Sequence, residues 1–451
     1  MSASALPAAW AALVAPLLRA VEEHRTPAAL AGLFGSAKGF VLSALSRQLA
    51  AQGTSLLVVT PTDESAETLH GDVAFFHQLQ GVSHEDVLLF PGWGVLPYAT
   101  TPPPVEVIGQ RMRALDRLHG SERGLVLITP AAAFLQRLLP QSLFAEACFS
   151  LKAGASIERT RLLTRLVRLG YHHVSVAERP GEFAVRGGIV DLFSTAQEEP
   201  ARIEFLGDTI ETLRLFDPAT QKSSGRAADI RVLPARELIR TGEEGAAPLP
   251  PDAEWRGPAV YSTMETLLDH FPSPPVLIAD EPLDLRKHAD DFLDEARTAY
   301  STLEPTDSLP PSPDELFLRL DHLMEAGGAR CLVTLETIPQ GETQGATSSD
   351  TALFRFEAQR PQAIGIGVKG RPFSETVTHL EALRARGPVV IVARSRGQVD
   401  RLRSLFVEHN LPAEPLGDKT ATSLGAHAPY ALVQGGLSGG LLGLRGAWGG
   451  L

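Results

Sequence analysis

Short runs of apolar residues, each next to a segment with helical spacing, recur through this chain. They lie at residues 55–59, 125–129, 275–279 and 388–393, and none of them alternates polar with apolar residues. Strands with this composition are buried on both faces, as in parallel sheets that are covered by helices on both sides. Between the runs, residues 64–78 place their apolar side chains on one helical face. The sequence therefore predicts an α/β fold built on a parallel sheet.

A middle segment has a different pattern. Residues 156–170 have the spacing of a basic amphipathic helix, and several short alternating runs follow. One of these runs, ARIEFL, alternates apolar and charged residues, and the Gly207–Asp208 pair after it predicts a hairpin turn. These features predict a small α+β domain inserted into the first domain.

The changes of pattern divide the chain into five parts. We expect an α/β domain at residues 1–142, an α+β domain at 143–225, the completion of the first domain at 226–345, a linker at 346–361 and a second small α/β domain at 362–451. The last 17 residues contain eight glycines, so we expect an irregular end there and no ordinary helix or strand.

Charge and composition narrow the possible functions. Lysine and arginine total 41 against 53 acidic residues, and this net charge of −12 disfavours a DNA-binding module. No run of about 18 uncharged apolar residues appears, and the N-terminus lacks the basic start of a signal peptide. We therefore expect a cytoplasmic protein without membrane contact. The two cysteines and thirteen histidines show no metal-ligand spacing, so the sequence predicts no metal and no cofactor.

The stretch GLFGSAKG at residues 32–39 resembles a phosphate-binding loop, which needs the pattern G-x-x-x-x-G-K-[ST]. Gly32 and Lys38 match the pattern. Ala37 replaces the second glycine, and Gly39 replaces the serine or threonine whose hydroxyl binds Mg²⁺. The loop thus predicts a degenerate site that no longer hydrolyses nucleotide, with weak nucleotide or phosphate binding as an alternative.

A second nucleotide-site motif is VLIADE at residues 276–281. Four apolar residues followed by Asp280 and Glu281 resemble the strand that holds Mg²⁺ and activates water in nucleotide hydrolases. The alternative is a buried strand that ends in two solvated carboxylates. Together with the loop, these residues predict a degenerate nucleotide site of Gly32, Lys38, Gly39, Asp280 and Glu281. If the site were intact, the chain would be an active ATP-binding helicase module acting on damaged DNA.

Two further stretches are candidate binding surfaces. The proline-rich segment 90–104 carries Trp93 and Tyr98, which either contact a partner or pack on the domain beneath a rigid connection. In the segment RPGEFAVRGGIVDLF, strand alternation places Arg186 opposite Phe183. Arg186 is either an interface anchor or part of a solvated strand face.

The stretches GLFGSAKGFVLSAL, FPGWGVLPYATTPP with IGQRMRALDRL, and GEFAVRGGIVDLFSTAQEEPARIEFLGDTIETLRLFDPATQKS resemble the N-terminal part of the bacterial transcription-repair coupling factor family (Mfd). The resemblance implies a module similar to the helicase subunit UvrB, with domain 1a at residues 1–142, domain 2 at 143–225, domain 1b at 226–345 and a third domain at 362–451. It also implies that this half of the family protein has lost ATP hydrolysis, so we expect this chain not to be an enzyme.

The resemblance further implies that domain 2 recruits UvrA in nucleotide excision repair. Arg186 matches an arginine of the family's UvrA-binding surface, and Arg179, Phe183 and Arg202 are nearby candidates. In the family, RNA polymerase and DNA are bound by other domains, including an ATP-dependent DNA translocase, before which we expect this chain to stop.

Overall fold

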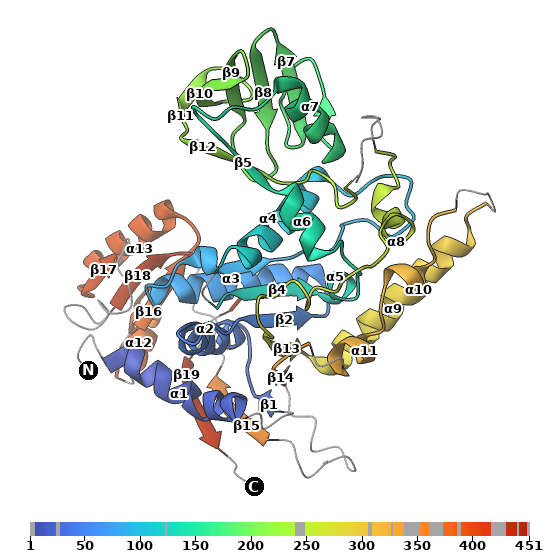
Figure 1. Cartoon of the computed structure of the whole chain (residues 1–451). Helices are drawn as coiled ribbons and strands as arrows, with labels where there is room; N and C mark the ends of the chain where they lie inside the picture. The colour runs from blue at the N-terminus through green and yellow to red at the C-terminus, as the bar shows by residue number, and fades with distance from the viewer. Residues whose placement is uncertain are drawn as a thin grey trace.

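The computed structural model describes residues 5–23, 28–121, 124–239, 249–304, 309–325, 328–337, 352–359, 373–385, 389–415, 430–439 and 442–448. Its framework is an eight-stranded sheet, which lies in the lower half of Figure 1. In spatial order its strands are β19 (Leu442–Trp448), β15 (Ala352–Gln359), β1 (Ala28–Ala31), β14 (Cys331–Glu336), β13 (Val276–Asp280), β2 (Leu56–Thr60), β4 (Val126–Pro130) and β3 (Val87–Leu89). Every neighbouring pair is parallel except β15 with β19, which confirms the predicted parallel α/β sheet.

Helices cover both faces of this sheet. Leu56 and Val58 of β2 enter the apolar core formed with α1 (Ala5–Glu22), α2 (Ala37–Ala50) and α3 (Asp63–Leu79). Leu57 and Val59 enter the core on the opposite face. The helices of that second core are α4 (Val105–His119), α5 (Ala131–Phe134), α6 (Gln141–Ala147), α9 (Pro282–Ser301), α10 (Pro313–Leu316) and α11 (Leu320–Glu325). Burial of both faces explains why the strand runs are continuously apolar.

A smaller six-stranded sheet projects from the first, at the top of Figure 1. Its spatial order is β11 (Ser223–Arg226), β10 (Thr209–Phe216), β9 (Ala201–Leu206), β8 (Ile189–Phe193), β7 (Glu182–Arg186) and β6 (His172–His173). Leu162 and Leu166 of α7 (Arg159–Arg168) share a core with the apolar face of these strands. The β9–β10 hairpin turns at Gly207 and Asp208 as predicted.

An antiparallel ribbon leads into and out of this unit. Its strands are β5 (Phe149–Lys152) and β12 (Asp229–Val232), and they pair over their whole length. A third, three-stranded parallel sheet consists of β16 (Val389–Ala393), β18 (Tyr430–Gln434) and β17 (Ala413–Pro415), with helices α12 (Phe373–Arg384) and α13 (Arg396–Glu408). Two short 3-10 turns (His84–Asp86 and Ala253–Arg256) and the one-turn helix α8 (Gly257–Val260) complete the described elements. Among the described residues, no helix is long and apolar enough to cross a membrane.

The structure corrects two local predictions and shows two further features that the sequence patterns did not indicate. The sequence AALA forms the interior strand β1 although alanine has low strand propensity, because β14 and β15 pair with it on both sides. Residues 352–359 of the expected linker form β15, while residues 346–350 lie outside the described part. The glycine-rich end is not wholly irregular, because β19 pairs with β15. The helices α10 and α11 are separated at Phe317, whose extended backbone bridges to Gln136.

Candidate functional site

The phosphate-like loop, which is the name used here for the stretch 32–39 that resembles a phosphate-binding loop, begins directly after β1 and leads into α2, as its motif predicts. Gly32 has a φ of +84°, and a Cβ there would lie 2.0 Å from the carbonyl oxygen of Phe356. This position therefore requires glycine for both its backbone conformation and its close contact with β15. The first glycine of the motif thus allows the loop to pack against β15.

The structure brings Lys38 together with both predicted acidic residues. Its Nζ donates to Asp280 Oδ1 at 2.5 Å and to Glu281 Oε1 at 2.7 Å. Burial disfavours the charged ammonium, but the two carboxylates outweigh burial and raise the pKa of Lys38. The lysine is therefore charged and is already paired with the two acidic side chains. Glu281 also accepts hydrogen bonds from the backbone N–H and the hydroxyl of Thr337.

The position of the missing magnesium ligand is closed by packing. A Cβ on Gly39 would lie 2.5 Å from the Cβ of Asp72 on α3 and 3.0 Å from the Asp72 carbonyl carbon. Side chains do not approach backbone so closely, so serine or threonine at position 39 would require α2 and α3 to move apart. Asp72 is 2% exposed. Its place beside Gly39 was not predictable from the sequence, because nothing in the local pattern sets Asp72 apart from the other acidic residues of its helix.

The second candidate site is the polar face of the six-stranded sheet. Arg202 lies directly across from Asp191 and donates to its two carboxylate oxygens, at 2.7 Å from Nε and 2.9 Å from Nη2. Arg186 reaches the same carboxylate at 3.9 Å. Asp191 is 1% exposed, whereas the side chain of Arg186 is 48% exposed. One buried carboxylate therefore holds two arginines on this face.

Further charged residues extend this face. Arg214 is directly opposite Arg202, and Arg226 is directly opposite Arg214. Glu204 lies 4.0 Å from Arg214 and accepts a hydrogen bond from Thr212. The face can present several guanidinium groups to an acidic partner, because these donors match carboxylates in a bidentate geometry. Asp191 was not selected from the sequence, although a lone aspartate within an apolar strand was a usable signal.

The other predicted partner residues have different positions. Phe183 is 2% exposed, and its ring stacks on His173 with centroids 5.0 Å apart. It therefore belongs to the core beneath the sheet, opposite Arg186, and does not lie on an exposed surface. Arg179 is exposed in the turn before β7, where its backbone N–H donates to Glu182.

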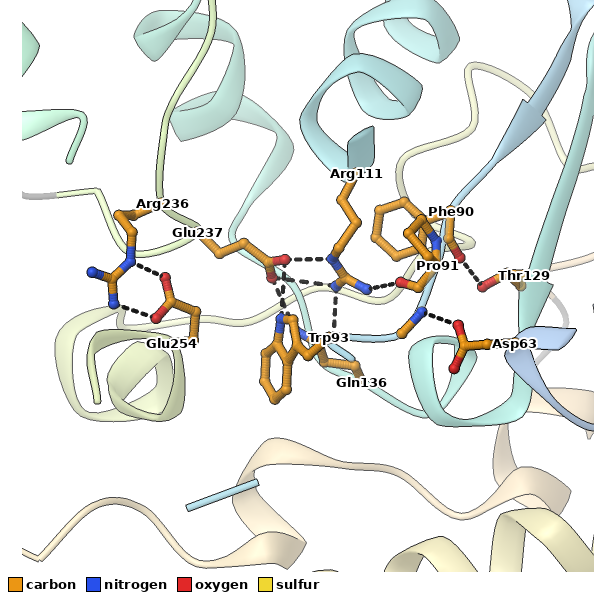
Figure 2. Close-up of polar contacts among 11 residues, drawn as sticks. Asp63, Phe90, Pro91, Trp93, Arg111, Thr129, Gln136, Arg236, Glu237 and Glu254 are labelled. Atoms are coloured by element: carbon orange, nitrogen blue, oxygen red, sulfur yellow. Dashed lines mark hydrogen bonds and ion pairs between the residues drawn. The ribbon is translucent and has the colours of Figure 1, made fainter. Parts of the chain in front are cut away.

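The segment that contains Trp93 is part of a buried polar network (Figure 2). Arg111, which has no exposed surface, donates to Glu237, to the carbonyl of Pro91 at 2.6 Å and to Gln136 at 2.6 Å. Trp93 Nε1 donates to the same Glu237 carboxylate at 3.1 Å. The network joins the proline-rich segment to the chain that leaves the six-stranded sheet.

The aromatic side chains of this segment are buried as well. Trp93 is 6% exposed and Tyr98 is 8% exposed, and both pack near Trp255. The two rings therefore pack on the domain, as the second interpretation of segment 90–104 predicts, and they do not form an exposed binding surface.

Comparisons with known proteins agree with this architecture. Residues 149–238 match the family model described as the UvrB interaction domain. The transcription-repair-coupling factor of Myxococcus xanthus is 30% identical over 90% of this chain and 36% of its own length. That of Escherichia coli is 27% identical over 83% of this chain and 34% of its own length. That of Mycobacterium bovis is 38% identical over 45% of this chain and 16% of its own length.

The chain thus spans about a third of the length of the relatives that match most of it. The matched interaction domain contains the ribbon, the six-stranded sheet and its arginine-bearing face. Together, the family model and the relatives support the resemblance: the chain is similar to an N-terminal region of the transcription-repair-coupling factors (Mfd), and its residues 149–238 match the UvrB interaction domain.

Proposed function

We propose that this chain recruits UvrA through the polar face of its six-stranded sheet, in nucleotide excision repair at stalled transcription complexes. The observation that carries the proposal is the exposed Arg186, tethered with Arg202 to the buried Asp191 inside the matched interaction domain. Arginines that are held in place before binding lose less conformational entropy on contact, and arginine is enriched among the residues that dominate binding energy.

We further propose that the chain hydrolyses no ATP. Three features support this proposal: Gly39 carries no hydroxyl, Asp72 fills the space where one would stand, and Lys38 is paired with Asp280 and Glu281. These residues do not fit Mg²⁺-bound ATP in the manner of an intact phosphate loop. The alternative of an active helicase module therefore has no support from the site geometry.

The boundaries of the inserted domain are also a proposal. We place them at the ribbon, because β5 and β12 close the unit and lie within the matched range 149–238. Domain 1a would end and domain 1b would begin next to this ribbon. The third domain would follow after β15 and would consist of the three-stranded sheet with α12 and α13, before β19 returns to the main sheet. Contacts with RNA polymerase and DNA would belong to other parts of the whole family protein.

Changing Arg186 to glutamate should weaken capture of UvrA by about 30-fold or more, because truncating or reversing a charged anchor costs about 2–5 kcal/mol. The measurement is the equilibrium affinity of purified UvrA for the full chain. The matched control is Arg161→Glu, which makes the same charge change on an exposed residue of α7, over the other face of the sheet. Equal affinities for the two variants would place the partner surface elsewhere.

Phosphate release from ATP should be at background in the wild-type chain and unchanged by Lys38→Ala. The assay uses the full chain with Mg²⁺ and millimolar ATP, followed by isothermal titration with the same nucleotide. Turnover that saturates with ATP and disappears in the Lys38→Ala variant would instead support the helicase alternative.

A further inference from the structure

The glycine-rich segment between the third sheet and β19 crosses the phosphate-like loop. It leaves β18 at Gly435, whose N–H donates to the carbonyl of Ala393 at 2.9 Å. Three residues later, Ser438 donates its backbone N–H to Asp72 at 2.8 Å, and its hydroxyl donates to the other oxygen of the same carboxylate. The segment is therefore fixed to α3 at the side chain that closes the position of the missing magnesium ligand.

The loop itself contacts the same segment. Ser36 stands at the N-cap of α2, but its hydroxyl makes no capping hydrogen bond to that helix. It donates instead to the carbonyl of Gly439 at 2.6 Å, and Ser36 has no exposed surface. A Cβ on Gly439 would lie 3.5 Å from the Cα of Gly35. The segment thus lies against the turn where a nucleotide phosphate would approach an intact loop.

Charge around the loop also favours a neutral peptide over a phosphate. Lys38 is the cation of the motif, and it is already paired with two carboxylates. Asp72 adds a third carboxylate next to Gly39. Burial is the main influence on Asp72 and raises its pKa, while the two hydrogen bonds from Ser438 oppose that rise. A polyphosphate here would face more acidic than basic groups, whereas a peptide offers neutral donors and acceptors.

We propose that the degenerate phosphate loop is a binding site for a peptide, and that its ligand is the chain's own segment Gly435–Gly439. The segment supplies a carbonyl acceptor to Ser36 and two donors to Asp72. The contact fixes the segment just before β19. That strand pairs with β15 and forms the edge of the main sheet. The proposal is independent of UvrA recruitment, whose arginines lie in the other sheet.

Hydrogen–deuterium exchange on the full chain tests the proposal. Asp72→Ala should speed exchange of residues 435–439 and of the first turn of α2 by about tenfold, since loss of a buried charged acceptor leaves two donors unpaired. Ser438→Ala removes only the hydroxyl and should have a smaller effect in the same two regions. The matched control is Glu67→Ala, which removes an exposed carboxylate from the same helix.

The combined Asp72→Ala/Ser438→Ala variant should exchange no faster than Asp72→Ala alone, because both changes remove one contact. If the Asp72 variant fails to fold, the test is the comparison of exchange rates between the Ser438→Ala and Glu67→Ala variants. The proposal would be overturned if residues 435–439 of the Asp72→Ala and Ser438→Ala variants exchanged at the same rate as in the Glu67→Ala control. Protection of residues 32–39 by millimolar ATP or pyrophosphate in the wild-type chain would also overturn it. UvrA affinity should be unchanged in Ser438→Ala, which separates this result from that of the recruitment proposal.

Discussion

Arg111→Ala should lower the free energy of unfolding by about 3–5 kcal/mol, which is the range for removing one partner of a buried ion pair. Arg111 has no exposed surface, and each of its three guanidinium nitrogens donates a hydrogen bond, to Glu237, Gln136 or the carbonyl of Pro91. Without it, the donors that remain to the 7% exposed carboxylate of Glu237 within the described part of the chain are the neutral ones of Trp93 and Gln136. The guanidinium also lies 4.0 Å from the ring centre of Phe90, so its removal leaves a cavity.

Urea unfolding followed by tryptophan fluorescence measures this loss, because Trp93 and Trp255 are in contact beside the network. The control is Arg117→Ala on the same helix. Arg117 is 49% exposed and pairs with Asp86 at 3.0 Å, so its removal should cost less than about 1 kcal/mol. Similar losses for the two variants would show that the network does not stabilise the fold.

Asp191→Ala should destabilise the six-stranded sheet by about 3 kcal/mol and also reduce UvrA capture. Asp191 is 1% exposed and accepts two hydrogen bonds from Arg202. Its removal leaves Arg202, which is 23% exposed and lies over Phe216, without its counter-ion. Arg186 loses the same tether, so the two guanidinium groups would repel each other and leave their present positions.

The matched control is Glu211→Ala, which removes an exposed carboxylate from β10 of the same sheet and should be nearly neutral. Thermal unfolding and UvrA affinity are measured on the same samples. Arg186→Glu should reduce affinity alone, whereas Asp191→Ala should reduce both affinity and stability. An Asp191 variant with wild-type affinity would show that its tether does not position the partner surface.

Elements that are decided by local pattern were predictable from the sequence. β2, β4 and β13 are buried on both faces, and their continuous apolar runs reflect this directly. The meeting of Lys38 with Asp280 and Glu281 follows from the geometry of parallel strands, whose carboxyl ends lie at one edge of the sheet. Strand alternation likewise placed Arg186 and Phe183 on opposite faces.

Features that depend on distant pairing were not predictable from the sequence. Asp72 and Ser438 are 366 residues apart, and the local sequence around each of them gives no indication of the contact. β1 and β19 are strands only because their neighbours complete the hydrogen bonds, since alanine and glycine have weak strand preference. Phe183 shares a core with Leu162 and Leu166 of α7, and the apolar face of this helix could be predicted but not the strand residues of that core.

The ribbon of β5 and β12 has an evolutionary consequence. Its pairing of Phe149 with Val232 puts the entry and exit of the inserted unit side by side, so the host chain continues almost as if uninterrupted. A domain whose two ends lie side by side can be inserted into another fold, or removed from it, without changing the path of the host chain. Insertions with adjacent ends are tolerated for this reason. The family model for residues 149–238 likewise covers this unit and little beyond it.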